Sequence, residues 1–137
     1  MGIFIDTGIF VAARNKSDIA HDKAKILLHQ IASGQHGAYY TSDYIFDEAV
    51  TVAQVRTKSH EMARDIGSFI LDMPNLKIQF VDEGLLKEAW DIHEQYADRM
   101  LSFTDCSSIA RCRRFKISTI CTTDAHFNGI IDKVLFP

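Results

Sequence analysis

Short apolar runs alternate along the chain with longer stretches in which apolar residues recur at helical spacing. The first run, Ile3-Phe4-Ile5, is β-branched and aromatic and ends at once in Asp6, which predicts a short buried strand. Comparable runs predict further strands within residues 38–42, 76–81, 118–123 and 133–136. Apolar positions spaced three and four residues apart predict helices over residues 18–33, 43–57, 59–72, 83–97 and 103–115.

The order of these elements predicts an α/β fold. Because one or two helices separate successive strands, the strands need crossover connections, and the central sheet is expected to be mostly parallel. Helices should then cover both faces, which gives a three-layer α/β/α sandwich. No linker, repeat or low-complexity segment divides the sequence, so residues 1–137 are expected to form a single domain.

Charge and cysteine usage limit the class of protein. With 18 acidic and 15 basic residues the formal net charge is -3, so nucleic-acid binding would need a local patch or a bound metal. Cys106, Cys112 and Cys121 form no CxxC pair and lie in apolar stretches, which favours reduced thiols in the core. No signal-peptide pattern is present and no apolar run approaches the roughly 20 residues that span a bilayer, so we expect a cytoplasmic protein without membrane contact.

Two aspartates stand where predicted strands end. Asp6 follows the first strand directly, and Asp124 follows the strand predicted within 118–123. Ligands of parallel sheets bind beyond the carboxyl ends of the strands, so both acids are expected at one edge of the sheet. Each acid also has an ordinary role open to it, as a turn or helix-cap residue.

A third acid comes from the helix predicted over 43–57, where Asp47 and Glu48 are adjacent. Residues three and four apart share a helix face, which groups Glu48 with Ile45 and Val52. Asp47 lies instead on a polar stripe that water can cover. Glu48 interrupts an apolar face and would be costly to bury without a partner, so it is the stronger site candidate.

Asp105 is the fourth candidate. Ser102 stands three residues before it, as in a capping box. The small residues Cys106, Ser107 and Ser108 would also let this helix start approach the ends of the strands. A capping role and a place in an acidic site therefore both remain open for Asp105.

An acidic cluster of this kind needs a partner. Two carboxylates ~4 Å apart repel by about 4 kcal/mol at an effective dielectric constant near 20. A domain with a total stability of ~5 to 15 kcal/mol tolerates three or four such groups only if they are well solvated, partly protonated or bound to a cation. Oxygen ligands select hard ions, so the expected cofactor is Mg²⁺ or Mn²⁺.

Four motifs, in order along nearly the whole chain, resemble those of PIN domains: FIDTG, FDEA, SFTDCSSIA and TTDAHF. The resemblance implies a compact α/β/α nuclease fold in which Asp6, Glu48, Asp105 and Asp124 surround one or two divalent ions and catalyse RNA cleavage. Stand-alone members of this size resemble VapC-like toxins, which are generally homodimeric and restrained by a small antitoxin protein. Other members process RNA without an antitoxin.

Residues beside the acids add candidate supports and one departure from the family pattern. Thr7, Thr104 and Thr122 are candidates to hold the carboxylates in place. After the aspartate and threonine the family commonly carries Asn or Ser, whereas this chain has Gly8. Loss of a supporting side chain can weaken metal affinity or activity by about 10- to 100-fold, so a catalytically impaired domain that only binds RNA or protein is an alternative.

Basic residues away from the acids are the candidates for contact with the RNA substrate: Arg14, Lys16, Arg111, Arg113, Arg114 and Lys116. Four of these six follow one another at the end of the helix predicted over 103–115. Cations in a last helical turn also complement the helix dipole without any ligand, so this simpler role stays open.

Two other enzyme classes match single motifs. The letters IDTG also fit the Asp-Thr-Gly element of aspartic proteases, but those enzymes consist almost wholly of strands and need a second copy of the element. The letters HEMAR begin like the HExxH motif of zinc hydrolases, but Arg64 takes the place of the second histidine. Both classes are therefore disfavoured.

Overall fold

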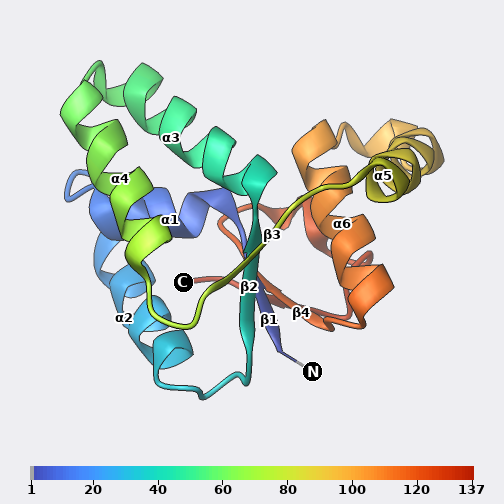
Figure 1. Cartoon of the computed structure of the whole chain (residues 1–137), viewed down its shortest axis with the longest axis horizontal. Helices are drawn as coiled ribbons and strands as arrows, with labels where there is room; N and C mark the ends of the chain where they lie inside the picture. The colour runs from blue at the N-terminus through green and yellow to red at the C-terminus, as the bar shows by residue number, and fades with distance from the viewer. Residues whose placement is uncertain (1) are drawn as a thin grey trace.

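The computed structural model describes residues 2–137, which fold into a sheet flanked by helices (Figure 1). The strands are β1 (Ile3–Ile5), β2 (Tyr39–Ser42), β3 (Lys77–Gln79), β4 (Thr119–Cys121) and β5 (Lys133–Leu135). The α-helices are α1 (Thr7–Arg14), α2 (His21–Ala32), α3 (Asp43–Thr57), α4 (His60–Asp72), α5 (Glu83–Gln95) and α6 (Phe103–Phe115). Short 3-10 helices occupy Ala97–Arg99 and Ala125–Phe127.

The strands form one parallel sheet in the order β3-β2-β1-β4-β5. Ile3 pairs with Tyr39 on one side and with Thr119 on the other, so β1 is the central strand. From β1 the chain first builds the sheet outward through β2 and β3, and it then returns to add β4 and β5 on the other side. The expected parallel α/β sheet is confirmed, and its direction of growth switches between β1 and β4.

Helices cover both faces of the sheet (Figure 1). In this view α1, α2 and α4 lie on one side and α5 and α6 on the other, while α3 starts at the end of β2 and leans over the upper edge. This arrangement is the three-layer α/β/α sandwich that the sequence predicts. It excludes the aspartic-protease alternative, which requires a fold built almost wholly from strands.

The core lies on both sides of β1. Ile3, Phe4 and Ile5 are all fully buried, as expected for a central parallel strand with helices on each face. The three cysteines are free and buried, which confirms them as core residues; burial raises the pKa of Cys106 to about 11 and that of Cys112 to about 12. Within residues 2–137, no helix combines the length and the apolar character needed to cross a membrane.

Helix α1 is the one α-helix that the sequence pattern did not predict. Six of its eight residues are buried, because α1 packs against α2, α3 and α4 close to the sheet. A helix buried on nearly all sides lacks the polar face that reveals a helical period. The uninterrupted apolar run at residues 9–13 shows no helical alternation, and a short run of this kind cannot be distinguished from a buried strand by periodicity.

Candidate active site

The switch between β1 and β4 brings two acids together from opposite ends of the chain. Asp6 follows β1, and its backbone N–H donates to the Cys121 carbonyl at 3.0 Å, which continues the pairing with β4. Asp124 follows β4 after two threonines. At such a switch the connections leave neighbouring strands in opposite directions and open a crevice at the carboxyl edge of the sheet. The predicted common edge is therefore present.

A pocket of about 680 Å³ opens at this edge, and we call it the acid pocket. Its wall includes all four predicted carboxylates, those of Asp6, Glu48, Asp105 and Asp124. Asp18, Arg56 and His126 also line it, and the sequence patterns did not single out these three. The structure thus brings the candidate acids into one cavity, while their roles as ligands and catalysts stay predictions.

Asp6 is the most buried of these acids, with 6% of its surface exposed. Its Oδ2 accepts a hydrogen bond from the Thr122 hydroxyl at 2.7 Å, whereas its buried Oδ1 has no hydrogen-bond partner within residues 2–137. Burial raises the pKa of Asp6 to about 7, and repulsion from Asp105 and Glu48 adds to the rise. Within the described chain its side chain makes no capping bond to α1, so helix capping does not explain this residue.

Glu48 reaches the pocket from α3. The Ser42 hydroxyl caps this helix by accepting a bond from the Ile45 N–H at 3.1 Å. One turn further on, Glu48 Oε1 accepts a bond from the Thr7 hydroxyl at 2.6 Å. Its neighbour Asp47 is exposed and lies outside the described lining of the pocket. The difference in helix face that the sequence predicted for the two acids is therefore present.

Asp105 is at once a helix cap and a wall of the acid pocket. The Ser102 N–H donates to its Oδ2 at 3.1 Å and the Asp105 N–H donates to the Ser102 hydroxyl at 3.0 Å, which completes a capping box. Burial raises the pKa of Asp105, and repulsion from Asp124 and Glu48 acts in the same direction. The two roles that the sequence left open are compatible, because the capping bond uses only one carboxylate oxygen.

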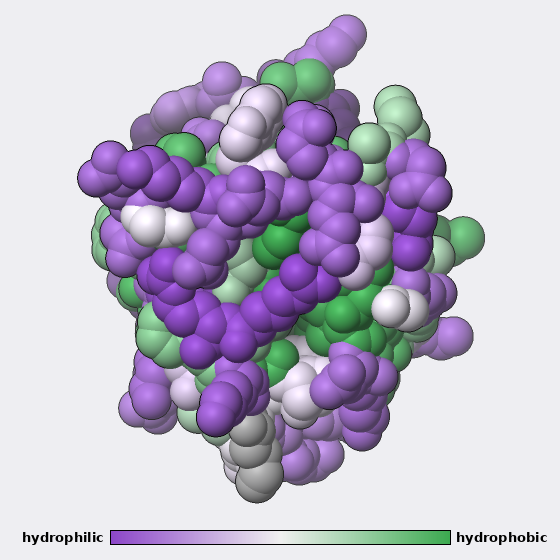
Figure 2. Space-filling view, turned by 90° about the vertical axis from the view of Figure 1, so that its right-hand side faces the viewer, coloured by the Kyte–Doolittle hydropathy of each residue, from purple (hydrophilic) through white to green (hydrophobic). Residues whose placement is uncertain are grey.

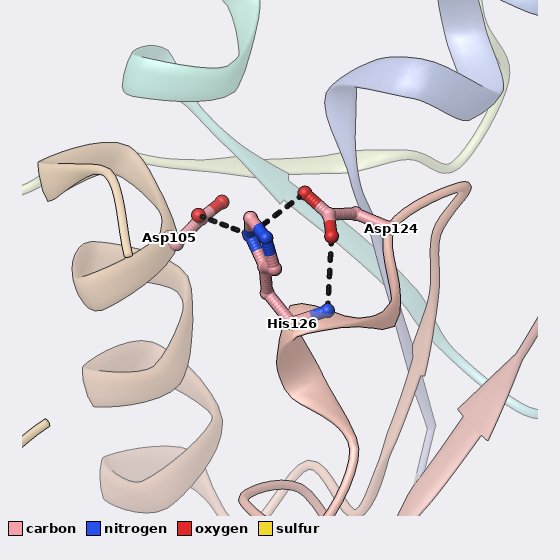
Figure 3. Close-up of side chains that lie close together, drawn as sticks. All are labelled: Asp105, Asp124 and His126. Carbon is pink, nitrogen blue, oxygen red and sulfur yellow. Dashed lines mark hydrogen bonds and ion pairs between the residues drawn. The ribbon is translucent and has the colours of Figure 1, made fainter. Parts of the chain in front are cut away.

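His126 lies between two of the acids (Figure 3). Its Nδ1 is 3.1 Å from Asp124 Oδ2 and 3.9 Å from Asp105 Oδ2. The backbone N–H of His126 also donates to Asp124 Oδ1 at 2.9 Å, so the chain folds back on the aspartate in an Asx turn. Sequence reasoning missed this histidine, although its place two residues after a turn-forming aspartate was the available signal.

These groups fit a hard divalent cation. One possible ligand atom from each of Asp105, Asp124 and His126 lies within 4.8 Å of the other two. Asp6 adds a buried oxygen without a partner in the same pocket, which is costly unless something compensates its charge. A set dominated by carboxylate oxygens suits Mg²⁺ or Mn²⁺ better than a softer metal.

Thr123 explains why residue 8 is a glycine. A Cβ atom on Gly8 would lie 2.1 Å from the Thr123 hydroxyl oxygen and 3.2 Å from the Thr123 Cβ. The Thr123 side chain therefore occupies the space that a side chain at residue 8 would need, and both residues line the acid pocket. The departure from the family pattern leaves no gap in the wall, because the loop after β4 supplies a hydroxyl there.

Two of the three threonines predicted as supports contact the acids. Thr7 and Thr122 donate to carboxylates as described above, and the Thr122 hydroxyl also accepts a bond from the Asp124 N–H at 3.0 Å. Thr104 instead bonds within α6, where its carbonyl accepts from the Ser107 hydroxyl at 2.7 Å, and it lies outside the described lining of the pocket. Within residues 2–137 the Thr104 hydroxyl makes no hydrogen bond to the acids, and its supporting role stays a prediction.

Two of the predicted RNA contacts are engaged elsewhere in the fold. Arg111 is only 5% exposed; its guanidinium donates to the Phe80 carbonyl and lies 4.9 Å from the centre of the Phe115 ring. Arg111 is thus held within the fold, and its expected RNA contact stays a prediction that this burial disfavours. Arg14 makes two hydrogen bonds of 2.9 Å to Asp65 and is not among the described residues that line the acid pocket.

The other basic candidates lie away from the acids. An α-helix rises 1.5 Å per residue, so Arg113 stands roughly 12 Å along α6 from Asp105. Arg114 already forms ion pairs with two acidic side chains, at 2.6 and 3.4 Å. RNA contact from Arg113, Lys116 or the exposed Lys16 stays a prediction. The basic residue that does line the acid pocket is Arg56 of α3, which the sequence patterns did not single out.

Comparison with known proteins agrees with this architecture. The crystal structure of VapC20 from Mycobacterium tuberculosis, described as a Sarcin-Ricin loop cleaving toxin, has a TM-score of 0.82 and 26% identity over 95% of this chain and 97% of that one. VapBC2 from Rickettsia felis, bound to a DNA fragment from its promoter, shares the fold with a TM-score of 0.73 at 16% identity, over 99% and 98% of the two chains.

Sequence comparison identifies the family. The 23S rRNA-specific endonuclease VapC20 of Mycobacterium tuberculosis is 25% identical over 127 residues, which cover 93% of this chain and 92% of that protein. The family model described as PIN domain matches residues 3–132. This match spans nearly the whole chain and includes all four candidate acids, so the protein belongs to the PIN domain family.

Proposed function

We propose that this protein is a metal-dependent endoribonuclease that hydrolyses RNA phosphodiester bonds and acts as the toxin of a toxin-antitoxin pair. The observation that carries the proposal is the acid pocket, where Asp6 is buried among other carboxylates and burial raises its pKa to about 7. A group so poorly stabilised as an anion points to a cation as the missing partner. The name of the relative VapC20, a 23S rRNA-specific endonuclease, supports RNA as the substrate.

Asp6, Asp105 and Asp124 would hold one or two Mg²⁺ or Mn²⁺ ions, with His126 as an additional ligand. A divalent cation supplies two effects when bound: it lowers the pKa of a water molecule, and it offsets the charge that builds on the phosphoryl oxygens. The Thr122 hydroxyl fixes Asp6 through Oδ2, which leaves Oδ1 as the oxygen available for a ligand.

Glu48 is the group best placed to handle the proton of the attacking water. Thr7 holds its Oε1, so Oε2 is the oxygen that would orient the water and accept its proton. Two hydroxyls, those of Thr7 and Thr122, keep the carboxylates in fixed positions before RNA arrives. Such preorganisation lowers the cost of arranging charges at the moment of reaction.

A small antitoxin partner, a homodimeric assembly and a cytoplasmic location complete the proposal. They rest on membership of the PIN domain family and on the description of the VapC20 structure as a toxin. Induced expression of the protein in a bacterial host should arrest growth, and expression of the Asp6→Asn variant should not. Equal growth arrest by both proteins would contradict a toxicity based on cleavage.

Incubation of the purified protein with labelled single-stranded RNA tests the activity directly. Cleavage should require Mg²⁺ or Mn²⁺ and should stop when a chelator is added. Loss of a residue that only supports a metal ligand lowers metal affinity or activity by about 10- to 100-fold. Asp6→Asn changes a proposed ligand itself, so it should lower the cleavage rate by more than about 100-fold.

The matched control is Asp65→Asn, which changes the same residue type outside the acid pocket. It should leave the cleavage rate within about twofold of the wild type, as expected for a surface position. Cleavage that persists in chelator, or an Asp6→Asn variant with the wild-type rate, would contradict the proposal.

A further inference from the structure

A second cavity, of about 250 Å³, adjoins the acid pocket. It lies between loop 15–19, the last turns of α3 and the start of α4, and we call it the side niche. Val11, Asp18, Ile19 and Arg56 line both cavities, so the niche opens at the border of the acid pocket. A group held in the niche would therefore lie next to the proposed site of cleavage.

The side niche is lined by both apolar and polar side chains. Val11, Ala53 and Ile66 are buried and form apolar walls, while Asn15 and Ser17 bring polar groups to the opening. Its volume lies just under the ~300 Å³ at which small-molecule pockets begin, which suits one flat ring system better than a whole nucleotide. The niche thus has the size and polarity expected for a single nucleobase.

Ile19 stands at the border of the two cavities with its whole side chain in water. Two of the local hydrogen bonds that hold the loop in shape involve side chains: the Ser17 N–H donates to Asn15 Oδ1 at 3.1 Å, and the Ala20 N–H donates to Asp18 Oδ1 at 2.8 Å. A ligand in the niche would remove apolar surface of Ile19 from water, which favours binding.

Arg56 provides a positive charge at the same border, next to Asp18, whose Oδ1 accepts the bond from the Ala20 N–H. Glu48, Val52 and Arg56 follow one another at intervals of four along α3, and all three line the acid pocket. Arg56 lies roughly 12 Å along the helix axis from Glu48, so it would meet a different phosphate from the one at the acids. Its side chain is exposed, and within residues 2–137 no hydrogen bond or ion pair engages its guanidinium.

The opposite side of the molecule offers a weaker candidate for RNA contact. Figure 2 shows the face that carries α5 and α6, where hydrophobic side chains appear among many hydrophilic ones. Trp90 is 55% exposed there and stacks on His93. However, the exposed residues of α5 around it include Glu88, Asp91 and Glu94, whose charges disfavour a phosphate backbone. The side niche has an arginine, Arg56, where it borders the acid pocket.

We propose that the side niche binds one nucleobase of single-stranded RNA and that Arg56 binds a phosphate beside the cleaved one. The inference rests on the proposed ribonuclease function and adds the residues that position its substrate. Ile19 packs against the inserted base. Because the base must leave its stack to enter, the niche selects unpaired segments over duplex RNA.

The salt dependence of binding tests Arg56. Binding is measured by fluorescence anisotropy of a labelled oligoribonucleotide in chelator, with Asp6→Asn as the common background so that no cleavage occurs. One lost phosphate contact should lower the slope of log affinity against log salt concentration by about 0.7 and weaken binding about 3- to 30-fold at low salt. Arg56→Met should show this loss. Arg64→Met, which removes an exposed arginine of α4 outside both cavities, should not.

Abasic residues in the oligoribonucleotide test the niche. Moving one abasic residue along the strand should weaken binding about 5- to 100-fold at one position, the range expected for loss of a single bound base. Ile19→Ser should abolish most of that position's effect, whereas Val55→Ser, an exposed apolar residue of α3 that lines neither described cavity, should preserve it. An equal effect at every position, or one that Ile19→Ser leaves unchanged, overturns the proposal.

The two experiments separate this inference from the proposed function. Both measure binding without cleavage, so they remain informative if the wild type cleaves nothing. Loss of salt slope and of the abasic effect in an inactive protein would support the niche and refute the nuclease. Metal-dependent cleavage together with unchanged binding by Arg56→Met and Ile19→Ser would support the nuclease and overturn the niche. Thermal melts of the four exposed-residue variants confirm that each is folded.

Discussion

Two aspartates, Asp6 in the acid pocket and Asp65 on α4, show opposite electrostatic behaviour. Arg14 binds Asp65 through two hydrogen bonds of 2.9 Å, and this pairing lowers the pKa of Asp65. Asp6 forms no ion pair within the described chain, and burial raises its pKa to about 7. The fold therefore stabilises the ionised form of Asp65 and disfavours the ionised form of Asp6.

The opposite pKa shifts of the two aspartates show which acid depends on a ligand from outside the chain to balance its charge. The charge of Asp65 is balanced by a neighbour that the fold itself provides. In the acid pocket the fold brings more carboxylates toward Asp6 instead, so it adds repulsion to the cost of burial. A domain of ordinary stability retains such a cluster at a cost, which a bound cation would offset.

The largest predicted effect is on the pH dependence of stability, which tests directly whether Asp6 differs from Asp65. Between pH 3.8 and about 7 the unfolded chain releases the Asp6 proton while the folded protein keeps it. Stability from this group is therefore complete at acidic pH and is lost as pH rises toward 7. At 1.36 kcal/mol per pKa unit, the free energy of unfolding should fall by up to about 4 kcal/mol between about pH 4 and pH 8.

Urea unfolding of the metal-free protein across this pH range measures the effect. Asp6→Asn should remove most of the fall, whereas Asp65→Asn should retain it. Saturating Mg²⁺ should restore stability to the wild type at pH 8, because a ligand that prefers the folded state stabilises it. An Asp6→Asn variant with the pH dependence of the wild type would show that Asp6 is not the strained acid.

An intermediate effect is expected from the wall of the acid pocket. Gly8→Ser places a Cβ atom 2.1 Å from the Thr123 hydroxyl, so the wall must shift, at a cost of about 1 to 3 kcal/mol. The clash should also move the nearby carboxylates and slow cleavage. Adding Thr123→Ala removes the hydroxyl and should recover most of the lost stability, as measured by thermal or urea unfolding.

Gly84→Ser is the matched control for this substitution. A Cβ atom there would come within 3.2 Å of the flexible end of Arg114, which can move away. Gly84→Ser should therefore cost little or even stabilise α5, because glycine is a poor helix former. If Gly8→Ser proves as harmless as Gly84→Ser, close packing by Thr123 does not explain Gly8.

The smallest predicted effect concerns the ion pair between Arg14 and Asp65. Arg14 and Asp65 have side chains that are 39% and 41% exposed, so water and salt screen their attraction. A double-mutant cycle with Arg14→Met and Asp65→Asn should give a coupling energy of under about 1 kcal/mol, and it should shrink at high salt. A salt-insensitive coupling energy of several kcal/mol would mean that the Arg14–Asp65 pair is effectively buried.

Several features could be predicted because each has a local signature. Asp6 and Asp124 follow strands, Glu48 interrupts an apolar helix face, and Asp105 stands three residues after a capping serine. Helix α1 could not be predicted in this way, because burial on nearly all sides removes the alternation on which the prediction depends. The burial of Arg111 could not be predicted either, because charge alone does not reveal that a side chain turns into the fold.

The amino-acid sequence was sufficient to predict the order of the strands and of every described α-helix except α1, the parallel sheet and the edge at which the acids collect. These follow from residue spacing and chain connectivity, which are properties of neighbouring positions. Three contacts became visible only in the folded molecule: His126 lies between two of the acids, Thr123 fills the space beside Gly8, and Arg56 borders two cavities. The pKa of Asp6 belongs to the same group, because distances between remote residues and the loss of water around a carboxylate depend on how all three layers pack together.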